Sequence, residues 1–316
     1  MKDRVHTSPN LIYSTGTQVV SLKRLQGSNG RTAHPAGAVG VIIRSPADRT
    51  HDYRVRFVDG FEATLHHDQL VLLAEYKQGE INDSSIVLST HQLFDRVIYR
   101  CVVGSQAYGL DTSDSDIDRR GIYLPPADLH WSLFGVPEQL ENDQTQEAYW
   151  ELQKFVIMAL KGNPNILECL YTPIVEHATT LANELLAMRH IFLSKLVFQT
   201  YNGYVMSQFK RMKAEVRNHG RIKWKHVMHL VRLLLSGVHV LRDRTVSVHV
   251  GNHRDNLLAI KSGSVPWNDV EAWRLELHAE FERAFEETDL PERPDYLAAN
   301  DFLVKARRAA VAEELP

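Results

Sequence analysis

The segment GSQAYGLDTSDSDIDRRG, residues 104–121, places a Gly-Ser pair ten residues ahead of an Asp-x-Asp motif. It follows VIYRCVV (97–103), a β-branched run that predicts a buried strand. The overlapping run IDRRGIYLP (117–125) predicts a second strand, which ends at a pair of prolines. The predicted order is therefore strand, tight turn, acidic loop and strand.

The two acids of the motif predict a metal site. Asp116 and Asp118 stand at positions i and i+2, which on a strand share one face about 7 Å apart, and Arg120 falls on the same face. Two converging carboxylates repel each other unless a cation lies between them. Mg²⁺ prefers carboxylate oxygens and keeps positions for phosphate oxygens, so we predict Mg²⁺ here, with Mn²⁺ as the alternative ion.

The Gly-Ser turn predicts an anion-binding element. A glycine directly after a buried strand lets the backbone approach a ligand, and amides that open a helix at residues 105–108 would point at a phosphate. The Ser105 hydroxyl would hold a terminal phosphate oxygen. Tyr108 would either stack on a base or pack under the loop. Asp111 and Asp114 are predicted to cap turns.

The whole pattern resembles the signature of the DNA polymerase β-like nucleotidyltransferase superfamily. Its fuller form, GSQAYGLDTSDSDIDRRGIYLPP (104–126) with LQKFVIMALKGNPNILECLY (152–171), is similar to a narrower bacterial and phage family, the RNA-repair-pathway branch of that superfamily. The resemblance continues through KWKHVMHLVRLLLSG (223–237) and LPERPDYLAANDFLVKARR (290–308). It covers roughly residues 90–310 and leaves the N-terminal region outside.

The resemblance implies roles for the motif residues. Gly104 and Ser105 match the phosphate-contacting turn, Asp116 and Asp118 match the metal-binding acids, and Arg120 continues their strand. The implied reaction transfers a nucleoside monophosphate from an NTP to a hydroxyl group, with RNA as the implied acceptor. Transfer to a small molecule or a protein, or a non-catalytic scaffold that binds RNA or a partner, stays open as an alternative.

The superfamily adds a third acid on a later strand beside the first two. Glu168 is our first choice as this third catalytic and metal-binding acid, because the fold's strand–helix–strand order expects it after the helix predicted at 151–162. The run ILECLYTPIV (166–175) would then be that strand. Glu151, which precedes the helix, is the second choice, and a site without a third acid is the remaining alternative.

A basic stripe lies further along the chain. Lys225, His229 and Arg232 recur at i, i+4 and i+7 of a predicted helix, so they share one face. Such a stripe is commonly a solvated face. The resemblance implies instead that a helical domain forms the far wall of a cleft, where these cations would hold a triphosphate. Residues 210–225 are the most basic stretch and would contact a nucleic-acid backbone or form a solvated helix end.

The N-terminal region predicts a small β-structure. VGVIIRSP (39–46), YRVRFVDGFEATL (53–65, with an Asp-Gly turn) and LVLLAEY (70–76) read as short strands. Strands at this spacing predict an SH3-like or KOW-like barrel. Such barrels often bind nucleic acid or peptides, an expectation that rests on fold analogy alone. The segment KQGEINDSS (77–85) predicts a linker.

Composition sets the broad class. The 316 residues carry a formal net charge of −3, so any basic nucleic-acid surface must be local. Two cysteines and no apolar signal core at the start favour a cytoplasmic protein, and the sequence indicates neither a membrane nor a required protein partner. We predict an α+β protein in three domains: 1–80 barrel, 81–177 catalytic mixed sheet and 178–316 helical.

Overall fold

A computed structural model describes most of the chain, and the described residues are 13–27, 32–46, 52–78, 87–88, 91–113, 115–219 and 222–311, without the side chains of 32, 207 and 210–219. The chain divides into two compact units, Met1–Ser84 and Ser85–Pro316. The three-domain division with boundaries at 80 and 177 stays a prediction. No helix among the described residues combines the length and the apolar character that crossing a bilayer requires.

The first unit contains an antiparallel sheet in the order β6-β5-β4-β1-β7, with a separate hairpin of β2 and β3. Its elements are β1 (Gln18–Ser21), β2 (Leu25–Gln26), β3 (Thr32–His34), β4 (Val39–Arg44), β5 (Tyr53–Phe57), β6 (Glu62–Leu65), η1 (His67–Gln69), β7 (Leu70–Leu72) and α1 (Leu73–Gln78).

Strand β5 shows why this sequence forms a sheet with one buried face. Tyr53, Val55 and Phe57 are buried, whereas Arg54 and Arg56 between them are exposed. Because successive strand residues point to opposite faces, this alternation places all three apolar side chains in one core.

The predicted hairpin in 53–65 is confirmed. Asp59 Oδ1 accepts a hydrogen bond of 3.0 Å from the amide of Phe61, and Gly60 has φ +85°. The strand predicted over 70–76 is wrong in its second half, since α1 begins at Leu73. The described strands form a sheet and no closed barrel, because its edge strands β6 and β7 do not pair with each other. The assignment to an SH3-like or KOW-like fold is not confirmed, and the predicted linker lies largely outside the described residues.

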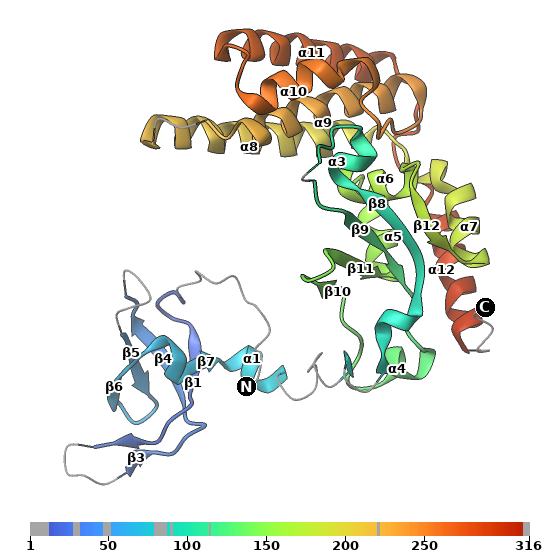
Figure 1. Ribbon diagram of the computed structural model, residues 1–316. Coiled ribbons are helices and arrows are strands. Elements are labelled where there is room, and N and C mark those ends of the chain that lie inside the picture. The colour runs from blue at the N-terminus through green and yellow to red at the C-terminus, as the bar shows by residue number, and fades with distance from the viewer. Residues whose placement is uncertain are drawn as a thin grey trace. The chain divides into compact units, whose positions relative to one another are not determined.

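The second unit is built on a mixed sheet in the order β10-β11-β9-β8-β12, and an α+β protein is thereby confirmed (Figure 1). Strands β9 and β11 run parallel, and the other neighbours are antiparallel. The strands are β8 (Val97–Val103), β9 (Asp118–Tyr123), β10 (Gln139–Asn142), β11 (Glu147–Glu151) and β12 (Val175–Ala178).

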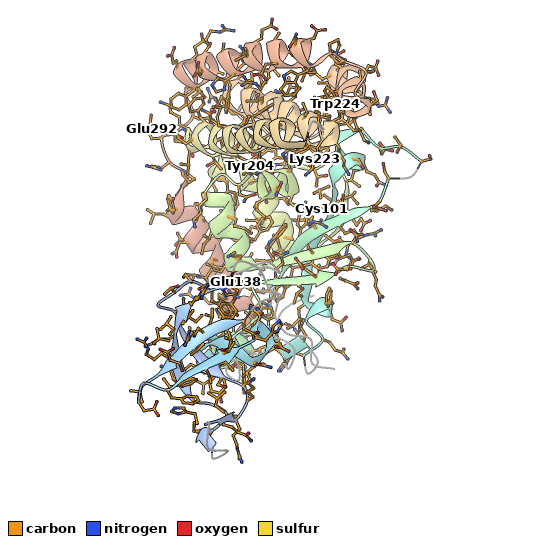
Figure 2. All side chains as sticks on the ribbon, turned by 90° about the vertical axis from the view of Figure 1, so that its left-hand side faces the viewer. Cys101, Glu138, Tyr204, Lys223, Trp224 and Glu292 are labelled. Carbon is orange, nitrogen blue, oxygen red and sulfur yellow. The ribbon has the colours of Figure 1, made fainter. Side chains whose placement is uncertain are left out.

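Helices cover one face of this sheet and extend beyond its end (Figure 1). They are η2 (Leu93–Arg96), α3 (Gly104–Tyr108), α4 (Ala127–Trp131), α5 (Leu152–Leu160), α6 (Pro164–Tyr171), α7 (Thr180–Ala187), η3 (Arg189–Phe192), α8 (Leu196–His219), α9 (Trp224–Asp243), η4 (Gly251–His253), α10 (Arg254–Ser262), α11 (Trp267–Glu287) and α12 (Tyr296–Val311). Helix α9 contacts α8, α10 and α11, and one hydrophobic core runs through sheet and helices. Figure 2 labels Tyr204, Lys223 and Trp224 in the helical layer and Cys101 in the sheet.

The strand predicted over residues 166–175 is wrong, because most of this run forms the helix α6. Asn163 caps the helix by accepting hydrogen bonds from the amides of Asn165 (3.0 Å) and Ile166 (3.4 Å), and Pro164 occupies its first turn. Glu168 therefore projects from a helix and not from a strand.

Between β9 and β11, residues 125–146 contain α4 and β10. The short 3-10 helix η2 leads directly into β8, and residues 89 and 90 further upstream lie outside the described residues. The helix predicted at 151–162 is confirmed as α5, which ends shortly before Gly162, a residue with φ +65°.

Gly121 in β9 offers a test of how closely β8 and β9 pack. A Cβ atom there would lie 1.8 Å from the backbone oxygen of Tyr99, so the strands would have to separate. Gly121→Ala should lower the free energy of unfolding by about 2–3 kcal/mol in chemical denaturation. Gly203→Ala is the matched control, since an added Cβ meets nothing within 4 Å on α8 and should stabilise the protein by about 1 kcal/mol. Equal effects of the two changes would contradict this packing.

Candidate active site

A pocket of about 470 Å³ lies between the end of the sheet and the helices α9 and α10. Nine of the eleven residues that the sequence nominated line it, and Arg232 and Glu151 do not. The nine are Gly104, Ser105, Tyr108, Asp116, Asp118, Arg120, Glu168, Lys225 and His229. These residues come from segments up to 125 positions apart in the chain (229 − 104).

Gly104 lets the turn after β8 lie directly against Asp118. Its φ of +71° lies in the left-handed region, and a Cβ atom there would come within 2.5 Å of Asp118 Oδ2. The strand register pairs Val103 with Asp118, so the turn and the acid are neighbours across the sheet. The left-handed backbone conformation favours glycine, and any larger residue would also have to displace the Asp118 carboxylate.

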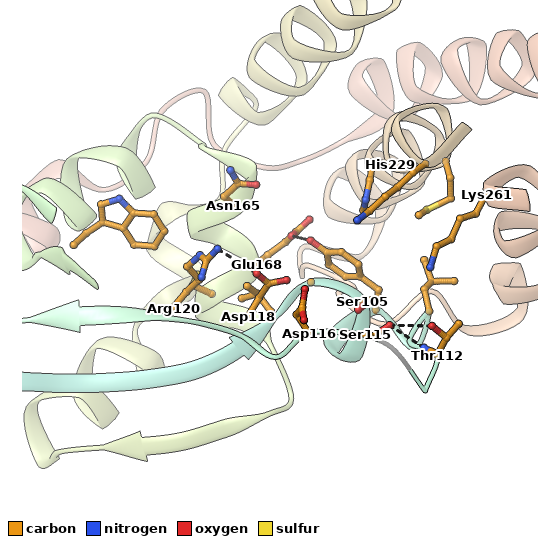
Figure 3. Close-up of a pocket in the computed structure, with 18 residues that line it drawn as sticks. Ser105, Thr112, Ser115, Asp116, Asp118, Arg120, Asn165, Glu168, His229 and Lys261 are labelled. Carbon is orange, nitrogen blue, oxygen red and sulfur yellow. Dashed lines mark hydrogen bonds and ion pairs between the residues drawn. The ribbon is translucent and has the colours of Figure 1, made fainter. Parts of the chain in front are cut away.

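The two acids reach the pocket from different kinds of structure. Asp118 is the first residue of β9 and accepts a hydrogen bond of 3.3 Å from Arg120 Nη2. Asp116 precedes the strand, so the predicted shared strand face holds for Asp118 and Arg120 only. Figure 3 shows both carboxylates turned into the pocket. Asp111 is exposed and does not line the pocket, and Asp114 lies outside the described residues.

The acid pair suits a hard divalent cation. Carboxylate oxygens are the ligands that Mg²⁺ uses, usually one or two from the protein together with substrate phosphates. No group of three or more Asp, Glu, His or Cys side chains within the described part of the chain is arranged to hold a metal ion. The residues present therefore fit a two-carboxylate site at Asp116 and Asp118.

Glu168 lines the pocket but is held by two other side chains. Its carboxylate is 2% exposed, accepts a hydrogen bond of 2.6 Å from Arg232 Nη1 on one oxygen, and accepts one of 2.6 Å from the Tyr108 hydroxyl on the other. The Arg232 guanidinium also lies 3.6 Å from the centre of the Tyr108 ring. Burial and then the charge of Glu168 raise the pKa of Tyr108. Tyr108 is thus buried by its contacts with Glu168 and Arg232, which favours the predicted packing role over base stacking.

Glu151, the other candidate for the third acid, lies outside the pocket. It ends β11 and caps α5, where its carboxylate accepts a hydrogen bond of 2.8 Å from the amide of Gln153. Arg307 Nη2 of α12 donates to its other oxygen at 2.5 Å. These contacts join the end of β11 to the helices α5 and α12, which accounts for the burial of Glu151.

The helical wall is less cationic than the sequence stripe suggested. Arg232 is buried against Glu168 and does not line the pocket. Burial, followed by the charge of Arg232, lowers the pKa of His229 to about 4, so its imidazole is neutral at pH 7. The amines that face the pocket are those of Lys225 and of Lys261 from α10, and neither has an acidic partner among the described residues.

Five polar or aromatic pocket residues were not nominated from the sequence: Thr112, Ser115, Trp150, Asn165 and Lys261. Thr112 and Ser115 brace the acidic loop, where the Ser115 hydroxyl accepts from the Thr112 amide at 2.9 Å. The others belong to no recognisable motif, and only the strand register and helix packing bring them to the pocket. In the basic stretch 210–225, the side chains up to 221 lie outside the described residues.

A Gly-Ser turn and two acids thus meet in one pocket at the end of a mixed sheet, beside the helices α9 and α10. Residues 73–305 match RlaP, the RNA repair pathway DNA polymerase beta family, and the chain belongs to that family. The resemblance drawn from the sequence is thereby confirmed.

The chain is also 34% identical over 98 residues to the uncharacterized protein YcgL of Bacillus subtilis (strain 168). The similar segment covers 30% of this chain and 38% of that relative.

The buried pair of Glu168 and Arg232 should show strong coupling. Arg232→Met should lower the free energy of unfolding by about 3–5 kcal/mol, because it leaves a carboxylate buried without its counter-charge. Adding Glu168→Leu to that variant should restore part of the loss, as measured by denaturant titration of the two single variants and the double variant. Strictly additive effects would contradict the coupling.

His229 should make stability depend on pH. The unfolded chain takes up a proton at this residue near pH 6.5, whereas the folded protein does so only near pH 4. Stability should therefore fall as the pH drops from 6.5 to 4, and this residue should account for up to about 3 kcal/mol. His229→Asn should flatten that part of the stability profile relative to the wild type. An unchanged slope would contradict a half-buried imidazole that is neutral at pH 7.

Proposed function

We propose that this chain is a divalent-metal-dependent nucleotidyltransferase that transfers a nucleoside monophosphate from an NTP to a hydroxyl group of RNA. The observation that carries the proposal is the composition of one pocket, in which the turn at Gly104 and the acids Asp116 and Asp118 meet two unpaired amines. Membership of the RNA repair pathway family supports both the chemistry and the class of acceptor.

The turn and the amines would bind the triphosphate. Gly104 allows the backbone to approach the phosphates, and the Ser105 hydroxyl would donate to a phosphate oxygen. Lys225 and Lys261 would neutralise the outer phosphates, which carry most of the negative charge of an NTP. Neutral His229 would act beside them as a hydrogen-bonding group and not as a cation.

Asp116 and Asp118 would hold Mg²⁺, with Mn²⁺ as the alternative. When bound, the ion would supply Lewis-acid activation of the attacking hydroxyl and neutralisation of the leaving pyrophosphate. A ligand role for Glu168 would require it to release Tyr108 or Arg232, so we propose that Glu168 positions the turn instead. Arg120, held by the carbonyl oxygens of Arg119 and Gln146, would keep the Asp118 carboxylate oriented.

The acceptor can be tested directly. Purified full-length chain is incubated with Mg²⁺ and each α-labelled NTP, together with total RNA, a protein mixture or an aminoglycoside. Label on RNA alone supports the proposal. Label on protein or on the small molecule favours those acceptors, and nucleotide binding without any label transfer favours a scaffold.

The acid pair should be indispensable for transfer. Asp116→Asn and Asp118→Asn should each lower label transfer by about a thousandfold or more, because losing a metal ligand forfeits several kcal/mol of transition-state stabilisation. Both variants should keep the wild-type circular dichroism spectrum. Asp111→Asn is the matched control, as it makes the same change at an exposed position of the same loop. Near-wild-type transfer by either pocket variant would overturn the mechanism.

A further inference from the structure

The pocket differs in chemical character between its two ends. Figure 3 shows Asp116 and Asp118 lying between Arg120 and Asn165 on one side and His229 and Lys261 on the other. The unpaired amine of Lys261 therefore belongs to one end. At the other end lies Arg120, whose guanidinium is already paired with Asp118 and with two carbonyl oxygens.

Strand register brings a tryptophan to the Arg120 end. Strands β9 and β11 are parallel, with Arg120 opposite Ala148 and Ile122 opposite Trp150. Because side chains alternate along a strand, Asp118, Arg120 and Trp150 belong to the same face of the sheet. Trp150 lies about 13 Å along the strand direction from Asp118, at roughly 3.3 Å per residue over four residues. Its indole lines the pocket and contacts Phe155 at a centroid distance of 6.2 Å.

Asn165 completes this end of the pocket. It lies in the first turn of α6, is exposed, and lines the same pocket. Its backbone amide donates a hydrogen bond to Asn163 Oδ1, the cap of α6, whereas its side-chain amide makes no hydrogen bond with any described residue. An asparagine side chain presents a donor and an acceptor side by side, which is the arrangement that pairs with the edge of a nucleobase.

We propose that Trp150 and Asn165 form the nucleobase subsite of the NTP. This inference rests on the proposed function and extends it. One end of the pocket carries Lys261, whose amine has no acidic partner among the described residues. The acids Asp116 and Asp118 follow, and the other end carries the indole of Trp150 and the side-chain amide of Asn165. That order matches the triphosphate, the reacting phosphorus and the heteroaromatic base of one NTP. Trp150 stacks on the base, and Asn165 reads its edge.

The size of the pocket favours the incoming nucleotide over the acceptor as the occupant. Its volume of about 470 Å³ is in the range of small-ligand pockets. Both ends belong to this single cavity, so one mononucleotide can contact Lys261 and Trp150 together, whereas an RNA strand would have to extend beyond it.

The test compares a ligand that has a base with one that lacks it. The dissociation constants of ATP, GTP, CTP, UTP and inorganic tripolyphosphate are measured by calorimetry with Mg²⁺ on the full chain. Trp150→Leu should weaken binding of the NTPs by about tenfold to a hundredfold, the value of one base stack, and should leave tripolyphosphate binding unchanged. Trp150→Phe should retain most of the NTP affinity, because it keeps an aromatic face. Asn165→Ala should reduce the differences among the four NTPs.

Two controls separate the subsite from general effects. Trp131→Leu makes the same change at a residue that is 65% exposed and outside the pocket, and should alter neither class of ligand. Lys261→Met should weaken NTPs and tripolyphosphate alike, since it acts on the phosphates.

Three results would overturn the subsite. They are unchanged NTP affinity in Trp150→Leu, an equal loss for NTPs and tripolyphosphate, and a loss confined to RNA binding, which would make Trp150 part of the acceptor site. In each case the wild type still binds NTP, so the proposed function survives. If the wild type binds neither NTP nor tripolyphosphate and transfers no label, the proposed function fails as well.

Discussion

The ion pair between Glu168 and Arg232 is the interaction on which the pocket depends. Both side chains are almost completely removed from water, so each charge is tolerated only because the other is there. The Tyr108 hydroxyl satisfies the second carboxylate oxygen, and its ring faces the guanidinium. Glu168 belongs to α6, Arg232 to α9 and Tyr108 to α3. Their contacts therefore fix α9 relative to α6 and to the turn that follows β8.

The same short helix α3 is also held from its other side. The amide of Val250 donates to the carbonyl oxygen of Tyr108 at 3.0 Å, and Arg254 Nε donates to that of Gly109 at 2.9 Å. Gly109 has φ +69°, and a Cβ atom there would lie 2.3 Å from His249 Nε2. The turn that carries Ser105 is thus held by two parts of the chain, and the proposed transfer of a phosphoryl group would benefit from such a preorganised site.

The motif residues could be found from sequence because their chemistry is local. A glycine after a buried strand and two acids one residue apart keep their meaning in any tertiary setting, and Gly104, Asp116 and Asp118 do meet in one pocket. The prediction failed where it relied on topology. The Asn163–Pro164 pair is a helix-start signal, and this local signal prevails over the strand–helix–strand order that the superfamily implies, so Glu168 lies on a helix.

The sequence by itself determined the family, the mixed α+β character and the residues of the Gly-Ser and Asp-x-Asp motifs, because these depend on neighbours along the chain. Only the tertiary structure decided which charges are available in the pocket. Helical spacing puts Lys225, His229 and Arg232 on one face, but burial makes the histidine neutral and Glu168 occupies the arginine. The desolvation of a charged group depends on the atoms that remote segments pack around it. The packing of α10 likewise places Lys261 in the same pocket as Asp116 and Asp118.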